Sequence, residues 1–436
     1  MLDRLFALET FGIKLGLENI SRLCSALGHP ERRFVTLHVA GTNGKGSVAA
    51  MTHASLVAAG RRAARYTSPH LTDITERFVI GDAPVTAATL DAVASRVLDC
   101  AEAMQARGEL RVPPTFFEAT TATAFELFRE AGVEVAVIEV GLGGRFDATN
   151  VISPAAGAIT TIGFDHQQYL GHSLAEIAFE KAGIIKPGMT VVTGTLPEEA
   201  RTVIQRVADE RGARLFDAFE GTTSTIEMRD GVARLSVTTP RRAYGPVALG
   251  LRGQHQVSNA MVAIRLLEEA AAHGIDVPAD AIAQGLARPQ WPARLELFTL
   301  DNGRRVLLDA AHNLDGAAAL AEYLRQWHRE RPALVLGVMR DKDVDAMLAL
   351  LIPEVSSIVA TAAPTPRAMP PDDLARRAVD VAADLAPARR LPITTVADPA
   401  EAVQVALERS RDVCIAGSIF LAGAVRADLQ RRAILR

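Results

Sequence analysis

The chain has 436 residues, of which 49% are hydrophobic and 22% are charged, and its formal net charge is −4. This length predicts two or three domains with sizeable cores, and the modest charge gives no reason to expect a nucleic-acid or membrane-surface partner. The three cysteines form no C-x-x-C pair, which argues against a disulfide scaffold or a zinc site and for a reducing compartment. We see neither a signal peptide nor an apolar run of the roughly 20 residues needed to span a bilayer, so we expect a cytoplasmic protein.

A phosphate-binding loop is predicted near the start of the chain, after one or two short helices in residues 1–27. Residues 34–40 form a short apolar run that is typical of a buried parallel strand. The sequence GTNGKGS follows at residues 41–47, and an alanine-rich segment then predicts a helix that ends near Gly60. Glycines let backbone N–H groups approach an anion, the helix N-terminus adds a partial positive charge, and Lys45 would reach the outer phosphates.

This loop differs from the common nucleotide-binding pattern G-x-x-x-x-G-K-[ST], because Val39 stands where the first glycine of that pattern would be. A glycine-rich turn without a ligand is the alternative. A lysine between two glycines, directly after a buried strand, argues against that alternative. In the favoured interpretation, Ser47 would face a phosphate or Mg²⁺.

Further candidates for ligand binding follow two later elements. Residues 61–68 predict a strand that ends in TSPH, and loops at the carboxyl ends of parallel strands are where α/β proteins bind ligands. Ser68 and His70 are therefore candidates for phosphate or metal contact, with a plain turn as the alternative. Residues 86–107 and 115–130 predict helices. Phe116 and Phe117, at the start of the second helix, would either pack in the core or flank a flat aromatic ligand.

A divalent-ion site is predicted where two more strands end. Residues 135–140 form an apolar strand with Glu139 near its carboxyl end, and a buried carboxylate normally has a cation or several donors as partner. The glycine-rich sequence GLGGRFDATN follows it. Residues 156–161 predict another strand, which leads to Asp165 and His166. Because both strands end at one sheet edge, Glu139 and His166 are predicted to be ligands of one divalent ion. The alternatives are a structural ion pair at the end of the Glu139 strand and a loop histidine without a functional role.

The rest of the chain predicts a second domain. Helices are expected at residues 174–182, 198–211 and 254–272, a strand at 191–194, and an antiparallel hairpin or small sheet within 222–251. Two prolines in residues 288–294 mark a domain boundary. Beyond it, strand and helix alternate five times, with strands near 306–309, 333–338, 357–361, 394–396 and 413–416, which implies a parallel sheet with right-handed crossovers.

We therefore expect an α/β protein. Residues 1–289 would form a P-loop-type ATPase domain with a mostly parallel sheet and a small antiparallel sheet. Residues 290–296 would be a linker or hinge, and residues 297–436 a smaller, Rossmann-like α/β domain. Asp309 to Asn313, Met339 to Asp343, and Gly417 with Ser418 are expected at strand carboxyl ends in this second domain.

Taken in order, the motifs resemble a known family. They are GTNGKGS (41–47), TSPH (67–70), EVGLGGRFDATN (139–150), DH (165–166), EKAGI (180–184), HQVSNA (255–260), PAR (292–294), DAAHN (309–313) and DKD (341–343). The set is similar to the bifunctional folylpolyglutamate synthase/dihydrofolate synthase family of the Mur ligase superfamily, over residues 13 to 418. The resemblance implies a ligase that uses ATP to convert a pterin-linked carboxylate into an acyl phosphate, which the amino group of L-glutamate then attacks.

The resemblance also implies residue roles. The ATP contacts would be Thr42, Asn43, Gly44, Lys45, Gly46, Ser47, Asn259, Arg294 and Asp309. The Mg²⁺ ligands would be Ser68, Glu139 and His166. The segments that bind dihydropteroate would be Ile13, Lys14, Leu15, Thr115, Phe116, Phe117, Glu118, Phe146, Asp147 and Ala148. His312 and Ser418 would face glutamate, and Lys45, Lys181 and His312 would be catalytic.

Lys181 matches a lysine that the family carries as a carbamate. A carbamate is an anion that can help to hold a second Mg²⁺, so the resemblance implies two metal ions. Ordinary pairing of Glu180 and Lys181 on a helix is the alternative reading. The implied partners are small molecules only, namely dihydropteroate or a reduced folate together with L-glutamate, and we expect a monomer.

The sequence departs from the family pattern at Lys14, where aspartate is common, at Ala293, where glycine is common, and at Leu314, where proline is common. The first departure leaves open whether both activities are present or only polyglutamylation. Two other classes remain as alternatives. One is a Mur-type ligase that joins a different amino acid to a different carboxylate, and the other is an ATPase switch or transport subunit.

Overall fold

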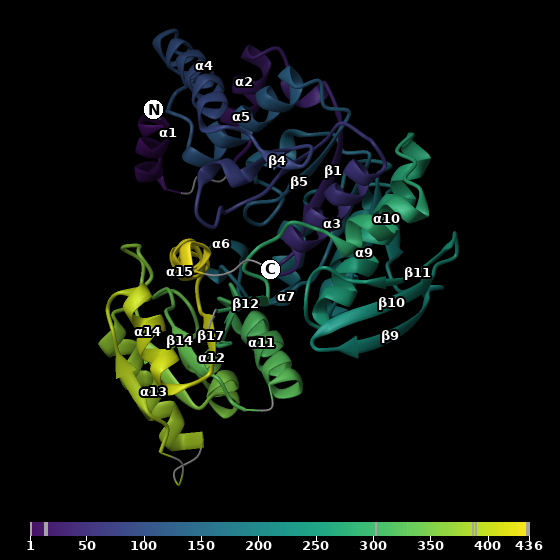
Figure 1. Ribbon diagram of the computed structural model, residues 1–436. Coiled ribbons are helices and arrows are strands. Elements are labelled where there is room, and N and C mark those ends of the chain that lie inside the picture. Colours follow the sequence, from purple (N-terminus) through teal and green to yellow (C-terminus); the bar gives the residue numbers. More distant parts are fainter. Residues whose placement is uncertain are drawn as a thin grey trace. The chain divides into compact units, whose positions relative to one another are not determined.

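The computed structural model of the chain describes residues 2–12, 16–300, 303–328, 330–385, 388 and 390–432 (Figure 1). The chain forms two compact units. The first unit consists of Met1–Ile226, Leu235–Gly250 and Val257–Gln290, and the second of Glu227–Arg234, Leu251–Gln256 and Trp291–Arg436. The main division thus follows Gln290, within the proline-containing segment. Two short segments that come earlier in the sequence belong to the second unit.

Up to residue 290, helices alternate with strands along most of the chain. In chain order the elements are α1 (Asp3–Ala7), α2 (Glu18–Ala26), β1 (Val35–Ala40), α3 (Lys45–Ala58), β2 (Ala63–Tyr66), β3 (Phe78–Ile80), β4 (Ala83–Pro84), α4 (Ala87–Ala106), α5 (Phe116–Glu130), β5 (Val135–Glu139), β6 (Ala156–Ile159), α6 (Gln167–Leu170), α7 (Leu174–Ala182), β7 (Thr190–Thr193), α8 (Glu198–Glu210), β8 (Arg214–Asp217), β9 (Thr223–Arg229), β10 (Val232–Thr238), β11 (Ala243–Ala248), α9 (His255–Ala270) and α10 (Ala279–Ala287).

The large sheet of the first unit has the strand order β4-β3-β2-β5-β1-β6-β7-β8. The strands from β2 to β8 along this order pair in parallel, whereas β3 and β4 form an antiparallel edge. Val39 of β1 is level with Glu139 of β5, and Ala40 is level with Ile159 of β6. The carboxyl ends of these three neighbouring strands therefore meet at one edge of the sheet, as the sequence predicts.

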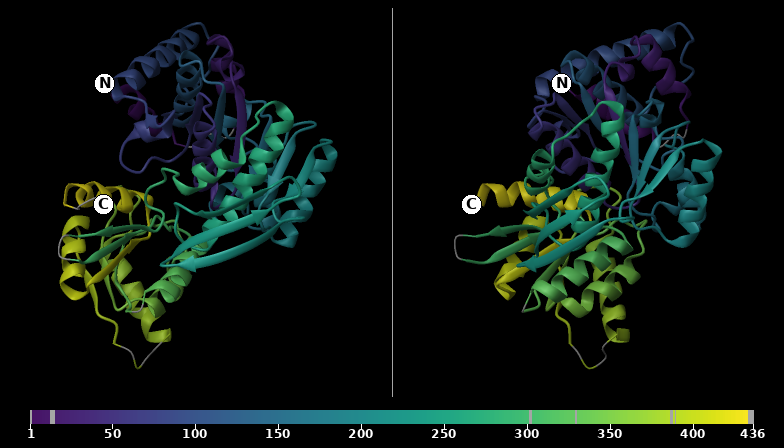
Figure 2. Two further views of the ribbon diagram at one scale, coloured as in Figure 1. Left: turned by 45° about the vertical axis from the view of Figure 1, so that its right-hand side comes forward. Right: turned by 90° about the vertical axis from the view of Figure 1, so that its right-hand side faces the viewer.

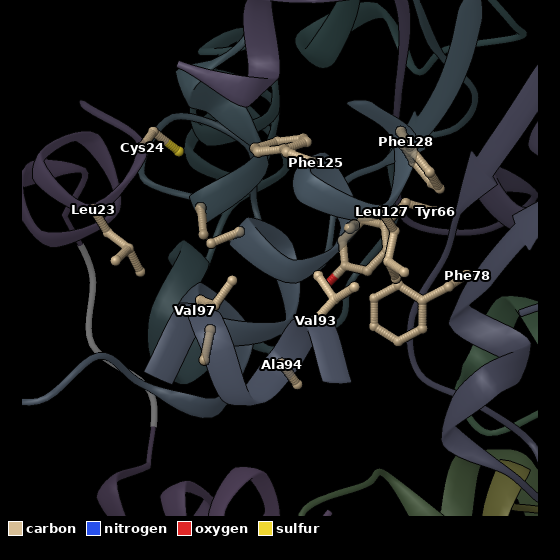
Figure 3. Close-up of a cluster of buried hydrophobic side chains, with 14 of the residues drawn as sticks. Leu23, Cys24, Tyr66, Phe78, Val93, Ala94, Val97, Phe125, Leu127 and Phe128 are labelled. Atoms are coloured by element: carbon tan, nitrogen blue, oxygen red, sulfur yellow. The ribbon is translucent and has the colours of Figure 1, made fainter. Parts of the chain in front are cut away.

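The two faces of this sheet bury different side chains. Tyr66 and Ile138 belong to a hydrophobic cluster with the helices α2, α4 and α5, and Figure 3 shows Tyr66 and Phe78 against this helical layer. Alternate residues point to opposite faces of a strand. Glu139 and Arg65 therefore lie on the other face, against which α3 packs. The face with Tyr66 and Ile138 thus packs on a hydrophobic layer of helices. The face with Arg65 and Glu139 carries buried charges near the carboxyl ends of the strands.

A second, three-stranded sheet follows, with the order β11-β10-β9 (Figure 2). It is antiparallel, as predicted for residues 222–251. The alternation of buried and exposed residues in β10, with Ala233, Leu235 and Val237 buried, is typical of a strand with one covered face. Glu268 at the end of α9 accepts hydrogen bonds from Thr239 and Tyr244, which fixes this helix to the sheet.

The second unit is also α/β. Its elements after residue 290 are β12 (Glu296–Thr299), β13 (Arg305–Leu308), α11 (Leu314–Trp327), β14 (Ala333–Leu336), α12 (Val344–Leu351), β15 (Ser357–Ala360), α13 (Pro371–Leu385), β16 (Ile393–Thr395), α14 (Pro399–Arg409), β17 (Asp412–Ala416) and α15 (Ile419–Arg432). The sheet order is β12-β13-β17-β14-β15-β16, and all neighbours except β12 and β13 pair in parallel.

The prediction of a mostly parallel sheet, a small antiparallel sheet and a second α/β unit is confirmed. Sequence reasoning missed the strands β3, β4, β8 and β12, each of which has only two to four residues and so gives too short a pattern to recognise. The cysteines are all free. Among the residues that the structure describes, none of the helices combines the length and the apolar character needed to cross a bilayer.

Candidate active site

The predicted phosphate loop lies between β1 and α3 and has room only for glycine at two positions. Gly41 has φ +145°, and a Cβ atom there would lie 1.9 Å from Thr160 Oγ1. Gly44 has φ +85° and precedes the first residue of α3, and a Cβ atom there would lie 2.3 Å from Asn259 Oδ1. The fold therefore brings Asn259, a predicted ATP contact, directly against the loop. Lys45, Gly46 and Ser47 form the first turn of α3, where backbone N–H groups are available to an anion.

The loop is held by the segment that follows β6. The N–H of Thr42 donates to the carbonyl oxygen of Thr161 (2.8 Å), and the N–H of Asn43 donates to Thr161 Oγ1 (3.1 Å). Thr160 Oγ1 donates to the carbonyl oxygen of Asn43 (2.6 Å). Sequence reasoning did not single out Thr160 and Thr161. Two adjacent hydroxyl residues at the end of a buried strand were the available indication.

Two lysines converge on one carbonyl oxygen of this loop. Lys45 Nζ donates to the carbonyl oxygens of Gly41 and Thr42, at 3.1 Å each, and Lys181 Nζ donates to that of Gly41 at 2.8 Å. Lys181 lies near the end of α7 and is buried. Burial, together with the nearby charge of Lys45, lowers the pKa of Lys181 to about 7. This places a partly neutral amine beside the phosphate loop.

The predicted Mg²⁺ ligands lie at the same sheet edge. Glu139 ends β5 and is 4% exposed, and its Oε2 accepts the N–H of Ser68, which follows β2, at 3.2 Å. His166 follows β6, two strands from β5, and its side chain is 35% exposed with Nε2 3.8 Å from Asp165 Oδ1. The structure thus joins Ser68 and Glu139 directly and places His166 at the same sheet edge, after the second strand from β5.

This donor set fits a hard divalent cation. A carboxylate, a hydroxyl and one imidazole suit Mg²⁺, which usually keeps several waters and substrate oxygens as further ligands. Within the described part of the chain, no group of three or more His, Cys, Asp or Glu side chains is arranged to hold a metal ion. His70, the other candidate in TSPH, accepts a hydrogen bond from Arg77 Nε at 3.0 Å.

Arg65 is a buried charge that sequence reasoning missed. It is level with Val137, two residues before Glu139, so both charged side chains lie on the face that α3 covers. Its Nη1 donates to the carbonyl oxygen of Gln290 at 3.3 Å. Burial lowers the pKa of Arg65 to about 10, and the charge of Glu139 acts in the opposite direction. An arginine inside the apolar strand AARY was the indication in the sequence.

The loop after β5 is fixed by one carboxylate. Asp147 Oδ2 accepts the N–H of Leu142 (2.8 Å), and Oδ1 accepts the N–H (3.1 Å) and the hydroxyl (2.5 Å) of Thr149. Burial raises the pKa of Asp147, which these donors oppose. Phe146 is 37% exposed, and the Arg145 guanidinium lies 4.3 Å from the centre of its ring. Of the predicted segment 146–148, Phe146 is therefore the member at the surface, while Asp147 and Ala148 are buried.

The segment at the start of α5 is also organised locally. Thr115 and Glu118 form a capping box, in which Glu118 Oε2 accepts the N–H of Thr115 at 2.8 Å. Phe116 stacks on Phe6, with ring centres 5.9 Å apart. Phe117 packs so closely that a Cβ atom on Gly141 would lie 2.5 Å from its ring. This contact brings α5 against the loop that follows Glu139.

Three further predicted residues, Ile13, Lys14 and Leu15, lie outside the residues that the structure describes.

In the second unit, Asp309 follows β13 and accepts the N–H groups of Leu295 and Ala311, at 2.8 Å each. Burial raises the pKa of Asp309, and the nearby charge of Arg294 opposes this. His312 Nδ1 lies 2.9 Å from the carbonyl oxygen of Ala310, within the loop after β13. Ser418 follows β17, the strand next to β13, and its Oγ accepts the N–H of Phe420 at 3.1 Å. The four predicted residues of this unit are thus gathered at one sheet edge.

Comparison with known proteins finds two domain matches that cover most of the chain. Residues 39–267 match the model of the Mur ligase middle domain, and residues 293–419 match that of the Mur ligase glutamate ligase domain. The dihydrofolate synthase/folylpolyglutamate synthase of Mycobacterium tuberculosis is 37% identical over 437 residues, which cover 94% of this chain and 89% of that protein.

Solved structures extend the likeness to the fold. A structure of Mycobacterium tuberculosis folylpolyglutamate synthase complexed with ADP has a TM-score of 0.90 at 33% identity, covering 99% of this chain and 98% of that one. A structure of Escherichia coli FolC in complex with DHPP and ADP has a TM-score of 0.86 at 28% identity, covering 99% and 97%.

The protein is a Mur ligase, an enzyme that forms carbon–nitrogen bonds. This follows from both domain matches, and the two α/β units and the glycine loop with its two lysines are consistent with it. Within that class, the chain belongs to the dihydrofolate synthase/folylpolyglutamate synthase family.

Proposed function

We propose that this enzyme uses ATP to join L-glutamate to dihydropteroate and to folates through an acyl phosphate. The observation that carries the proposal is the convergence of Lys45 and Lys181 on the Gly41 carbonyl, at the sheet edge where Ser68 meets Glu139. The Mycobacterium tuberculosis relative, which covers 94% of this chain, carries the names of both activities, and one related structure holds ADP together with DHPP.

The reaction brings a substrate carboxylate against the γ-phosphate of ATP, so two anions must approach each other. The N–H groups of residues 42–47 and the ammonium of Lys45 would bind the phosphates and offset the charge that builds up there. Asn259 would contact the nucleotide beside Gly44. Ser68, Glu139 and His166 would hold Mg²⁺, which when bound neutralises phosphate charge.

Lys181 supports a second part of the proposal. Carbamate formation requires a neutral amine, and the lowered pKa of Lys181 supplies one near neutral pH. The carbamate would be an anion beside the phosphate loop and would help to hold a second Mg²⁺. The test is a well-resolved crystal structure with Mg²⁺ and ATP. Extra density on Lys181 Nζ is expected, and a bare amine there would contradict this part.

The second unit would supply the glutamate side. His312 and Ser418 follow neighbouring strands, and we propose that they contact L-glutamate, while Arg294 and Asp309 contact ATP. The acyl phosphate is easily hydrolysed, which favours closure around it with residues 290–296 as the hinge. In the first unit, residues 115–118 and 146–148, together with residues 13–15, would bind the pterin acid. We further propose a cytoplasmic monomer.

The deciding experiment measures phosphate release from ATP by the purified chain. We expect release only when a pterin carboxylate and L-glutamate are both present. Release without them would favour an ATPase switch, and release with another acid or amino acid would favour a different Mur-type ligase. Parallel assays with dihydropteroate and with tetrahydrofolate decide between both activities and polyglutamylation alone.

A further inference from the structure

A buried chain of polar side chains links β1 to the loop that follows β5. His38 of β1 is 0% exposed, and its Nε2 lies 2.9 Å from Thr149 Oγ1. Thr149 Oγ1 lies in turn 2.5 Å from Asp147 Oδ1. Val39 is level with Glu139, and the adjacent residue His38 points to the other face of the strand. The imidazole therefore lies on the sheet face opposite Glu139 and Arg65. The metal and phosphate contacts proposed above use none of these three side chains.

The donors around Asp147 set the direction of this chain. Oδ1 accepts the N–H of Thr149, Oδ2 accepts the N–H of Leu142, and the backbone of Gly141 also donates to this carboxyl. Backbone N–H groups are donors only, and an ionised carboxylate is an acceptor only. Asp147 is therefore arranged as a carboxylate, and the Thr149 hydroxyl must give its single proton to Oδ1.

The tautomer of His38 follows from this direction. Once the Thr149 hydroxyl has donated to Asp147, its oxygen can only accept from His38, so the proton must reside on Nε2. Nδ1 is then a bare acceptor, and it is buried without a hydrogen-bond partner among the residues that the structure describes. The opposite arrangement would need a protonated Asp147 and would leave an N–H at Nδ1 buried without an acceptor. The tautomer of His38 and the proton of Asp147 are thus linked.

We propose that His38 is a positioning residue for substrate recognition: its Nε2–H holds the Thr149 hydroxyl toward Asp147 and so fixes the loop of residues 141–149. This inference rests on the proposed function, in which Phe146, Asp147 and Ala148 belong to the segment that binds the pterin acid. Phe117, from the other pterin segment, packs on Gly141 of the same loop. Loss of the hydrogen bonds between His38, Thr149 and Asp147 would therefore loosen both segments that are proposed to bind the pterin acid. It would not remove any group that is proposed to contact ATP.

The first test is a matched pair of variants. Glutamine places an amide nitrogen near the position of the imidazole Nε2, whereas asparagine reaches only the position of Nδ1. We expect His38→Asn to raise the KM for dihydropteroate about tenfold, the scale of one lost buried hydrogen bond, with kcat and the KM for ATP changed less than about twofold. His38→Gln should restore the KM for dihydropteroate to within about threefold of wild type.

A second pair of variants tests Thr149, which lies between His38 and Asp147 in the series of hydrogen bonds. Thr149→Ser keeps the hydroxyl and should behave like wild type, whereas Thr149→Val should reproduce the KM effect of His38→Asn. Equal kinetics for His38→Asn and His38→Gln would overturn the proposal. A parallel rise of the KM values for ATP and dihydropteroate would overturn it too, because general loosening of β1 and its phosphate loop predicts that result.

The second test does not depend on activity; it needs the folded wild-type chain and, for assignment of the resonance, a folded His38→Gln variant. Side-chain ¹⁵N NMR of the full-length chain with ¹⁵N-histidine distinguishes the two neutral tautomers, and the resonance absent from His38→Gln identifies His38 among the 10 histidines. We expect a proton on Nε2; a proton on Nδ1 would refute the proposed direction. Burial, aided by the nearby charge of Lys186, lowers the pKa of His38 to about 3. The His38 imidazole should therefore stay neutral across the pH range in which an exposed histidine titrates.

The two tests separate failure of this inference from failure of the proposed function. If the wild-type chain ligates no glutamate to any pterin acid, the proposed function fails, and the NMR result still decides the direction of the His38 chain. If the wild-type chain is active and the Nε2–H tautomer is found, but His38→Asn has an unchanged KM for dihydropteroate, then His38 has no positioning role and only this inference fails.

Discussion

The two units each place a buried carboxylate at the carboxyl end of a central strand, but the surroundings of these carboxylates differ. In the second unit, Asp309 after β13 accepts two backbone N–H groups, one on each oxygen. In the first unit, Glu139 at the end of β5 accepts the N–H of Ser68 and shares its sheet face with the guanidinium of Arg65. One carboxylate thus organises its own loop, and the other belongs to a cluster of charges.

This difference teaches that position at a strand end does not by itself define a metal ligand. Backbone donors on both oxygens make Asp309 a loop anchor that also faces Arg294. The edge around Glu139 gathers cations, because Lys45 and Lys181 both donate to the loop after the neighbouring strand β1. Such an edge suits an anionic ligand such as a triphosphate together with its metal ion. Each prediction below tests one member of this comparison.

The largest expected effect comes from Lys45. Lys45→Ala removes the ammonium that would offset charge on the transferred phosphate, and we expect turnover to fall on the order of 10³-fold or more. Steady-state phosphate release measures this loss, and an unchanged far-UV circular dichroism spectrum serves as the control for folding. Near-normal activity would contradict the assignment of the phosphate loop. It would also contradict the proposal that the edge around Glu139, unlike the edge around Asp309, binds a triphosphate.

Asp309 is expected to be next. Asp309→Asn replaces an acceptor by a donor, so its amide would face the N–H of either Leu295 or Ala311 in a buried site. An unsatisfied buried donor costs about 1–3 kcal/mol, and we expect kcat/KM to fall about 10- to 100-fold. Thermal melting of the same variant measures the loss of stability. A variant with wild-type stability would show that Asp309 is not a loop anchor.

The sequence predicted the element types well, because apolar runs and glycine positions are local signals. It located β1, α3 and β5 and put their loops at one edge of a parallel sheet, since that follows from strand direction alone. It could not find the edge strand β12, whose pairing with β13 depends on contacts outside its own four residues. Element type is thus local information, whereas edge pairing is not.

The candidate site was predictable only in part. Lys45, Ser68 and Glu139 stand in conspicuous motifs, and the structure places them at one edge. Arg65, Thr160 and His38 were missed because each role depends on a partner far away in the sequence, namely Glu139, Asn43 and Thr149. Glu118, predicted to contact the substrate, also forms the capping box of α5. A single sequence cannot separate these two uses of a glutamate.

Glu139 gives a smaller effect that sharpens the comparison with Asp309. Glu139→Gln keeps the shape of the side chain and removes its charge, so we expect the Mg²⁺ concentration for half-maximal activity to rise at least about tenfold, with partial recovery of turnover at high Mg²⁺. Isothermal titration of Mg²⁺ into the enzyme–nucleotide complex gives a readout besides activity.

The matched control is Glu126→Gln, which removes another buried glutamate of the first unit, on α5, where it pairs with Arg129. This variant is expected to keep the Mg²⁺ requirement of wild type. An equal shift in both variants would mean that the effect of Glu139 is general destabilisation.

The smallest expected effect is the pH dependence that Lys181 adds to stability. Its pKa is lowered by burial to about 7, so between this value and its ordinary value the unfolded chain holds a proton that the folded chain has lost. Stability therefore rises with pH across this window, and the cost of burying the charged amine is fully present below pH 7. In CO₂-free buffer, the Tm of Lys181→Met minus that of wild type should fall by about 2 °C or more from pH 7 to about pH 9. A difference that is constant with pH would mean that the Lys181 amine stays charged beside Lys45, and it would remove the chemical basis for a carbamate at this edge.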